Sequence, residues 1–165
     1  MKKTYSGSWK PKNIAKYRGN VDNIKYRSLW ERNAFRYLDT ASWVKWWNSE
    51  ETVIGYICAT DNKPHRYFGD LTIRTDSGRT LLVEIKPHAQ TQPPKKKKLN
   101  EALTYMKNTS KWKYAQKFCD ERGYEFQIWT EHELEAMGVK TLSMKMKASK
   151  TKVGKRIWKT LKKRV

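Results

Sequence analysis

The sequence has 165 residues, enough for one domain with a substantial core, and eight Trp, nine Tyr and four Phe supply much of its apolar area. A formal net charge of +20 favours polyanionic partners, nucleic acid first and anionic membranes second. The sequence contains no run of about 18 apolar residues and no signal-peptide pattern, which excludes a membrane span and predicts a soluble, intracellular protein.

The spacing of the cysteines and histidines argues against a CxxC motif and against a zinc site. Cys58 and Cys119 stand far apart and form no CxxC pair, which predicts two reduced, buried thiols. The three histidines show no zinc-ligand spacing; they are His65, His88 and His132.

The first predicted elements are a basic arm and a helix. Residues 1–25 contain few apolar positions and several turn formers, so we expect an arm without regular structure. A helix is predicted from Ser28 to about Leu38, because Ser28-Leu29-Trp30-Glu31 has the form of a capping box. Glu31 falls within the apolar arc of this helix, which comprises Trp30, Ala34, Phe35 and Leu38.

Strands are predicted next. The aromatic and β-branched segment from Trp43 to Cys58 should hold one or two of them. Two better-defined strands, Arg66 to Arg74 and Thr80 to Lys86, flank the turn Asp76-Ser77-Gly78 in a hairpin-like pattern. In the second strand the side chains alternate, with Leu81, Val83 and Ile85 on one face and Leu82, Glu84 and Lys86 on the other.

Helical patterns dominate the following region. One helix is predicted from Lys95 to Lys107, with Leu99, Ala102, Leu103 and Met106 facing inward. A second is predicted from Ser110 to Arg122, ended by Gly123. A strand from Glu125 to Trp129 and a short helix, capped by Thr130-Glu131-His132-Glu133 and ended by Gly138, complete the pattern.

From Lys140 to the end the chain carries eleven Lys or Arg and no acidic residue. Val153, Ile157 and Leu161 keep a four-residue spacing, which predicts a basic amphipathic helix in part of this tail. The predicted organisation is an arm over 1–25, a domain over 26–138 and a basic tail over 139–165. The predicted fold class is α/β, with a central mixed β-sheet flanked by helices.

Four residues form a candidate site. Asp70 lies in a predicted strand, Glu84 and Lys86 share one face of the next strand, and Glu31 comes from the first helix. Carboxylates at this spacing suit Mg²⁺, a hard cation that prefers oxygen ligands. Phosphodiester hydrolysis needs a nucleophilic water, charge neutralisation and a positioned phosphate, and metal ions held by carboxylates supply all three. Lys86 would position the water or balance the charge of the transition state.

Gly69-Asp70 followed by Glu84-Ile85-Lys86 resembles the PD-(D/E)xK nuclease superfamily, with Gly69 where the superfamily's name has Pro. Three segments are similar to TnsA-like transposon end-cutting nucleases and to head-completion nucleases of large contractile-tail phages: Tyr26-Arg27-Ser28-Leu29-Trp30-Glu31, Glu84-Ile85-Lys86-Pro87 and Phe126-Gln127-Ile128-Trp129-Thr130-Glu131. The resemblance covers roughly residues 24–137 and implies a restriction-endonuclease-like core. It implies that Glu31, Asp70 and Glu84 are metal-site carboxylates, that Lys86 is the catalytic lysine, and that the Ile85 carbonyl is a further ligand.

The resemblance also implies an activity. The expected function is a DNA endonuclease dependent on Mg²⁺, with Mn²⁺ as a substitute, and within the superfamily a phage head-completion nuclease that acts on DNA during or after packaging. Two alternatives stay open: a transposon or restriction-type end cutter that needs a recognition partner, and a non-enzymatic basic virion protein that binds nucleic acid. The chain would work as a monomer or homodimer, with the phage head or portal, or a recognition protein, as its protein partner.

Basic side chains are expected to bind DNA phosphates with little sequence preference; they are Lys95, Lys96, Lys97, Lys98, Lys155, Arg156, Lys159, Lys162, Lys163 and Arg164. His88 and Gln90, shortly after Lys86, are weaker candidates for substrate contact.

Simpler interpretations exist for the site residues. Glu31 would serve only as a helix cap, Asp70 would be a strand-end or bulge residue, and Glu84 with Lys86 would form a surface ion pair. Against the last, Leu81-Leu82-Val83 is typical of a strand covered on both faces.

Overall fold

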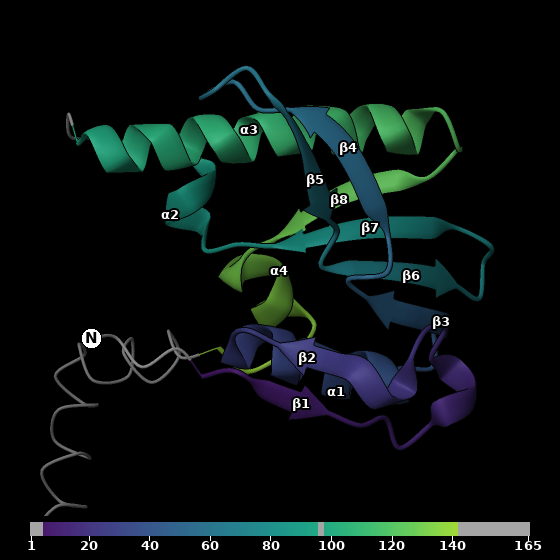
Figure 1. Cartoon of the computed structure of the whole chain (residues 1–165). Coiled ribbons are helices and arrows are strands. Elements are labelled where there is room, and N and C mark those ends of the chain that lie inside the picture. The colour runs from purple at the N-terminus through teal and green to yellow at the C-terminus, as the bar shows by residue number, and fades with distance from the viewer. Residues whose placement is uncertain (1–4, 96–97, 142–165) are drawn as a thin grey trace, which may run out of the picture.

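A mixed sheet with strand order β3-β6-β7-β8 forms the centre of the computed structural model, which describes residues 5–95 and 98–141 (Figure 1). Its strands are β3 (Val44–Ser49), β6 (Leu71–Thr75), β7 (Thr80–Ile85) and β8 (Glu125–Trp129). β6 pairs antiparallel with β3 and β7, whereas β7 and β8 are parallel. The parallel pair needs a crossover, which α2 (His88–Thr91) and α3 (Leu99–Asp120) provide.

Both faces of this sheet are covered, as the apolar run in β7 predicts. α1 (Leu29–Thr40) and α4 (Glu131–Ala136) pack on one face, where Leu81, Val83 and Ile85 join the larger core cluster. α3 and a separate hairpin cover the other face, where Leu82 packs. Every residue of β7 is buried, so any polar side chain on this strand lies away from bulk water.

The hairpin over the second face consists of β4 (Val53–Ile57) and β5 (Pro64–Phe68). The prediction of one strand from Arg66 to Arg74 is therefore wrong, because the chain leaves β5 at residue 68 and enters β6 at Leu71. The connection from β3 to β4, which lies beside it, bends as well. Glu50 in this connection has a φ of 55°, and its N–H donates to the Asp70 carbonyl at 3.3 Å. One arm of an antiparallel ribbon runs through β3 and then β4, and the other arm runs back through β5 and then β6. Both arms bend sharply between the two pairs of strands, and Asp70 stands at the bend.

Gly69 allows the bend to lie close to β7. A Cβ at this position would stand 2.6 Å from Cδ1 of Leu82, and the Gly69 N–H donates to the Thr52 carbonyl at 3.0 Å. A proline would lack this donor. The local geometry thus explains why glycine stands where the superfamily's name has proline.

The prediction of an N-terminal arm without regular structure over 1–25 is wrong for residues 7–25. β1 (Gly7–Trp9) pairs with β2 (Ile24–Tyr26), and short 3₁₀ turns occupy Ile14–Lys16 and Val21–Asn23. The Trp9 ring lies 5.6 Å from the ring of Trp47, and the Tyr17 ring lies 4.9 Å from it on centroids. Large aromatic area buried in this way outweighs the turn-rich composition.

Asp39, buried near the end of α1, holds the same segment in place. Its carboxylate accepts the N–H of Lys12 at 2.9 Å and of Asn13 at 3.2 Å, and the Asn13 side chain donates to the Asp39 carbonyl at 2.7 Å. The segment belongs to the fold through both its rings and its backbone.

The two helices predicted over Lys95–Lys107 and Ser110–Arg122 are one helix, α3. No Gly or Pro interrupts it, and the hydroxyls of Thr109 and Ser110 donate to carbonyls of the preceding turn. The predicted inward face of its first half is also wrong, because Leu99, Leu103 and Met106 are 74, 40 and 42% exposed. Figure 1 shows that this half of α3 extends past the sheet.

Other predictions are confirmed. α1, β8 and α4 occur where the patterns place them, and Gly123 and Gly138 end their helices with φ of +66° and +81°. Cys58 and Cys119 are buried and unpaired. Within the described ranges, no helix is long and apolar enough to cross a membrane. The amphipathic helix predicted in the tail lies outside the described residues.

Candidate active site

Asp70 and Glu84 lie close together where the bent ribbon meets β7. Asp70 was predicted to lie within a strand; it stands instead between β5 and β6, and its Oδ2 accepts the Ile85 N–H at 2.7 Å. Glu84 is on the adjacent strand and is only 2% exposed. The hydrogen bond ties the bend of the ribbon to the end of β7, which fixes the position of the Asp70 carboxylate relative to Glu84.

Lys86 and Tyr67 bind the two oxygens of the Glu84 carboxylate. The Lys86 ammonium lies 3.0 Å from Glu84 Oε1, and the Tyr67 hydroxyl donates to Oε2 at 2.5 Å. Glu84 and Lys86 therefore form an ion pair with a buried carboxylate and a partly buried ammonium, and the interpretation as a surface pair on a solvated strand does not apply. A buried carboxylate needs partners of this kind, because its desolvation cost is large.

The electrostatics of the site centre on Asp70. Burial, and then the neighbouring Glu84 carboxylate, raise the pKa of Asp70 well above its usual value, against the opposing effects of the Ile85 N–H and of Lys86. Burial alone would lower the pKa of Lys86, but Glu84 and Asp70 outweigh it and the pKa of Lys86 is raised. The site thus has more acid than its single paired lysine neutralises, which is a state that a bound cation relieves.

Glu31 lies at the edge of this group. It acts on the pKa of both Asp70 and Lys86, though as the smallest of the contributions to each. Its Oε2 accepts the Arg27 N–H at 2.9 Å and its Oε1 accepts the Ser28 hydroxyl at 2.8 Å. Ser28 in turn caps α1. Glu31 therefore caps the helix in the way the simpler interpretation expects, with Arg27 rather than Ser28 as the backbone donor, and also faces the acidic site.

The donor set fits a hard divalent cation. Asp70, at the bend of the ribbon, and Glu84, on the neighbouring strand β7, offer carboxylate oxygens close to one another. Glu31 offers a third carboxylate nearby. Mg²⁺ prefers such oxygen ligands and keeps several waters, so it needs few protein groups. The Ile85 N–H is engaged by Asp70, and the role of the Ile85 carbonyl as a ligand stays a prediction.

A different group of possible ligands lies at the tip of the β4–β5 hairpin. One ligand atom each of Cys58, Asp61 and His65 lies within 4.8 Å of the others, so the fold brings His65 beside possible ligands that its spacing in the sequence does not reveal. The imidazole is already 2.8 Å from the Asp61 carboxylate, and Asp61 also accepts the Lys63 N–H at 3.1 Å. These bonds account for the arrangement of the turn without an ion.

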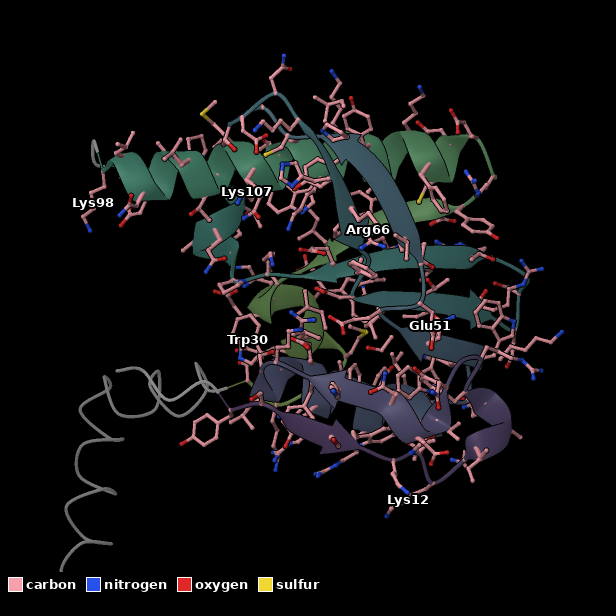
Figure 2. All side chains as sticks on the ribbon, viewed as in Figure 1. Lys12, Trp30, Glu51, Arg66, Lys98 and Lys107 are labelled. Atoms are coloured by element: carbon pink, nitrogen blue, oxygen red, sulfur yellow. The ribbon has the colours of Figure 1, made fainter. Side chains whose placement is uncertain are left out.

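The remaining predicted contact residues are distributed around the site or outside the described residues. His88 is exposed at the start of α2, where its N–H donates to Glu131 at 2.8 Å. Gln90 lines a cavity of about 450 Å³ between α2 and α3. Lys95 is exposed, and Figure 2 shows Lys98 at the beginning of α3, where it pairs with Glu101 at 2.9 Å. The other basic residues predicted to bind DNA lie outside the described residues: Lys96, Lys97, Lys155, Arg156, Lys159, Lys162, Lys163 and Arg164.

Two side chains near the site were not identified from the sequence. Tyr67 was assigned only to a strand, and its pairing with Glu84 depends on the bend of the ribbon. Lys111 lies with its ammonium 5.6 Å from the centroid of the Tyr67 ring. It lies within the helix predicted from Ser110 to Arg122, where its four-residue spacing to Ala115 and Cys119 places it on the inward face, but the prediction gave it no role.

Comparisons with known proteins identify the family of the chain. The TnsA-like endonuclease N-terminal family matches residues 41–131, which include Asp70, Glu84 and Lys86. The chain is also 44% identical over 146 residues to the head completion nuclease of Enterobacteria phage T4, an alignment that covers 82% of this chain and 97% of that protein. Both resemblances drawn from the sequence motifs are confirmed, as is the α/β, restriction-endonuclease-like fold.

Proposed function

Because the chain belongs to the family of TnsA-like endonucleases, and to that of the T4 head completion nuclease, we propose that it is a nuclease that cleaves DNA with a divalent cation, Mg²⁺ in the first place and Mn²⁺ as a substitute. The observation that carries the proposal is that three charged residues lie together at one point of the fold: Asp70, bound to the Ile85 N–H, and buried Glu84 with its partner Lys86. A nearly buried cluster of this charge is costly for the fold alone, which favours a role in chemistry.

Asp70 and Glu84 would hold the cation, with Glu31 completing this site or a second one. A bound Mg²⁺ would supply Lewis-acid activation of a water and neutralise charge on the phosphate. Glu84 positions Lys86 through their 3.0 Å contact. The raised pKa of Lys86 keeps its ammonium protonated, so it would act as a donor that orients the water and balances transition-state charge.

DNA is the substrate that the charge of the chain favours. A net charge of +20 suits a polyphosphate backbone, and neither the sequence nor the fold over residues 5–95 and 98–141 contains a recognisable element for base readout. The basic tail and Lys95–Lys98 would hold the backbone on either side of the cut. We infer that cleavage has little sequence preference.

The test is cleavage of supercoiled plasmid and branched DNA by the purified chain with Mg²⁺, Mn²⁺ or EDTA. Asp70→Ala and Lys86→Ala are expected to lower the cleavage rate by roughly 100-fold or more, the scale for losing one preorganised charge at a reaction centre. Asp76→Ala and Lys113→Ala are the matched controls, since both residues are exposed, and should cleave like the wild type.

The outcome separates the alternatives. Metal-independent cutting, or equal cutting by Asp70→Ala and Asp76→Ala, would show that the site is misassigned. Equal DNA binding without cutting by any variant would favour the non-enzymatic virion protein. Cutting that occurs only when a recognition protein is added would favour a partner-dependent end cutter.

We further propose that the chain acts on DNA at the phage head, during or after packaging, because its 44% identical relative bears the name of a head completion nuclease. Complementation would test this. Wild-type chain, but not Asp70→Ala, should restore infectious particles to phage T4 that lacks its head completion nuclease. Restoration by Asp70→Ala would contradict a role for cleavage in that step.

A further inference from the structure

One lysine of α3 stands on the buried face of the helix. The buried residues of α3 are Asn108, Ala115 and Cys119. Lys111 follows Asn108 by three residues and precedes Ala115 by four, which places all of them on one helix face. Lys111 is partly buried, whereas Lys113, about 200° around the helix, is exposed. A helix that only packed on the sheet would carry an apolar residue at position 111.

The contacts of Lys111 direct its charge toward the candidate active site. Its ammonium lies 5.6 Å from the centre of the Tyr67 ring, and the hydroxyl of that same ring donates to Glu84 at 2.5 Å. Among the residues that the structure describes, Lys111 forms no ion pair with a carboxylate, in contrast to Lys86. Burial lowers the pKa of Lys111, and Glu84 only partly offsets this.

A half-buried ammonium without a bound anion is costly, and a cation–π contact with Tyr67 offsets only part of that cost. Glu84 is already engaged by Lys86 and Tyr67, and Asp70 by the Ile85 N–H. The carboxylates would be further neutralised by the cation of the proposed reaction. The anion still missing from this arrangement is the one that the reaction brings, the phosphate group of the DNA.

We propose that Lys111 is a second catalytic lysine, which binds a non-bridging oxygen of the DNA phosphate that is hydrolysed. In this reaction a bond forms between the water oxygen and phosphorus while that water gives up one proton to the solvent, the bond from phosphorus to the leaving oxygen breaks, and the leaving oxygen takes up a proton from the solvent. Negative charge on the non-bridging oxygens is greatest in the transition state of this displacement. The Lys111 ammonium donates a hydrogen bond to one of these oxygens. The inference rests on the proposed nuclease function.

The experiment compares Lys111→Met, Lys111→Arg and Lys113→Met in the full-length chain. The two methionine variants lose the same charge from the same helix. Single-turnover cleavage of duplex DNA with Mg²⁺, at saturating enzyme, reports on the chemical step, and fluorescence anisotropy with Ca²⁺ in place of Mg²⁺ reports on DNA affinity. Thermal unfolding checks that each variant is folded, and Lys111→Gln replaces Lys111→Met if the latter is not.

The expected result is a loss of roughly 100-fold in the single-turnover rate for Lys111→Met, of the size seen when one transition-state donor is removed. Lys113→Met should change that rate by less than about fivefold, the limit for one surface charge. DNA affinity should change equally in both variants, and Lys111→Arg should recover most of the rate because it keeps the charge.

Two results would overturn the inference in distinguishable ways. Equal single-turnover rates for Lys111→Met and Lys113→Met, with Asp70→Ala still inactive, would remove Lys111 from the reaction and leave the nuclease standing. An absence of metal-dependent cleavage by the wild type itself would contradict the proposed nuclease function, and with it the role of Lys111.

Discussion

Asp70 and Glu84 illustrate a conflict between stability and chemistry at single residues. Burial and the neighbouring Glu84 carboxylate raise the pKa of Asp70, so the folded protein holds a proton there more tightly than the unfolded chain does. Stability is therefore lost as the pH rises from the usual pKa of Asp70 through its raised value, and the loss is complete at higher pH. A cation bound between the carboxylates would reverse it.

Asp70→Asn is expected to raise the melting temperature of the metal-free protein at pH 8 by on the order of a few degrees. The gain should fade as the pH is lowered toward 4, because the raised pKa of Asp70 leaves its carboxyl protonated in the folded protein, which then no longer holds a buried charge at this position. Added Mg²⁺ should raise the melting temperature of the wild type but not of Asp70→Asn. Scanning calorimetry in EDTA and in Mg²⁺ measures both effects; a stabilising effect of Asp70→Asn that is the same at pH 4 and pH 8 would contradict the electrostatic explanation.

Tyr67→Phe removes the hydroxyl that donates to Glu84 at 2.5 Å. Because the acceptor is a buried carboxylate, the variant should lose about 1–3 kcal/mol of unfolding free energy, as measured by urea denaturation. Tyr114→Phe serves as the control, since Tyr114 packs at the edge of the same core cluster. Equal effects of the two substitutions would mean that the bond to Glu84 contributes nothing specific.

At the scale of elements, side-chain periodicity and helix caps were sufficient to predict a helix or strand where the residues that determine it lie within that element. The alternation in β7 placed Glu84 and Lys86 on one face, and Ser28 marked the start of α1. The pattern of Thr130 and Glu133 marked α4, where the structure shows a full capping box. Each of these depends on residues within one turn or one strand, which the sequence displays directly.

The elements that were missed depend on partners distant in the chain. The bend at Gly69 exists because Leu82 lies beneath it and Thr52 accepts its N–H. The N-terminal segment is ordered by Trp47 and Asp39, more than 20 residues away. The same holds for the site: Tyr67 reaches Glu84 only because the ribbon bends, and Lys111 lies over the Tyr67 ring only because α3 packs on the hairpin.

Gly69→Ala tests the bend. Its methyl group would meet Leu82 Cδ1 at 2.6 Å, which should cost about 1–3 kcal/mol of unfolding free energy as overpacking. Displacement of the adjacent Asp70 should lower DNA cleavage as well. Gly55→Ala, on the same ribbon, has nothing within 4 Å of the added methyl and should be close to neutral by both urea denaturation and cleavage. An unchanged unfolding free energy in Gly69→Ala would show that the Leu82 side chain moves aside at little cost.

For the molecule as a whole, charge is concentrated at one end of the chain. Residues 142–165 contain ten Lys or Arg and no acid. Truncation after Thr141 should weaken DNA binding and flatten its dependence on salt, by about 0.9 in the slope of log affinity against log salt for each phosphate that the tail no longer neutralises. The single-turnover rate at saturating enzyme should change little, because Asp70, Glu84 and Lys86 remain.

Fluorescence anisotropy at several salt concentrations measures the slope for the full-length and truncated chains. Identical slopes would mean that the tail does not touch the DNA backbone. A lower single-turnover rate with an unchanged slope would instead assign the tail to the chemical step.

The N-terminal segment also closes one side of the sheet. β3 is an outer strand, and its free edge receives Tyr17 as a parallel bridge to Trp47 and the Arg18 N–H on the Trp47 carbonyl at 3.0 Å. An uncovered strand edge pairs readily with other copies of a chain. Loss of the first 19 residues would therefore expose this edge, together with Trp47, and should promote association between copies of the chain.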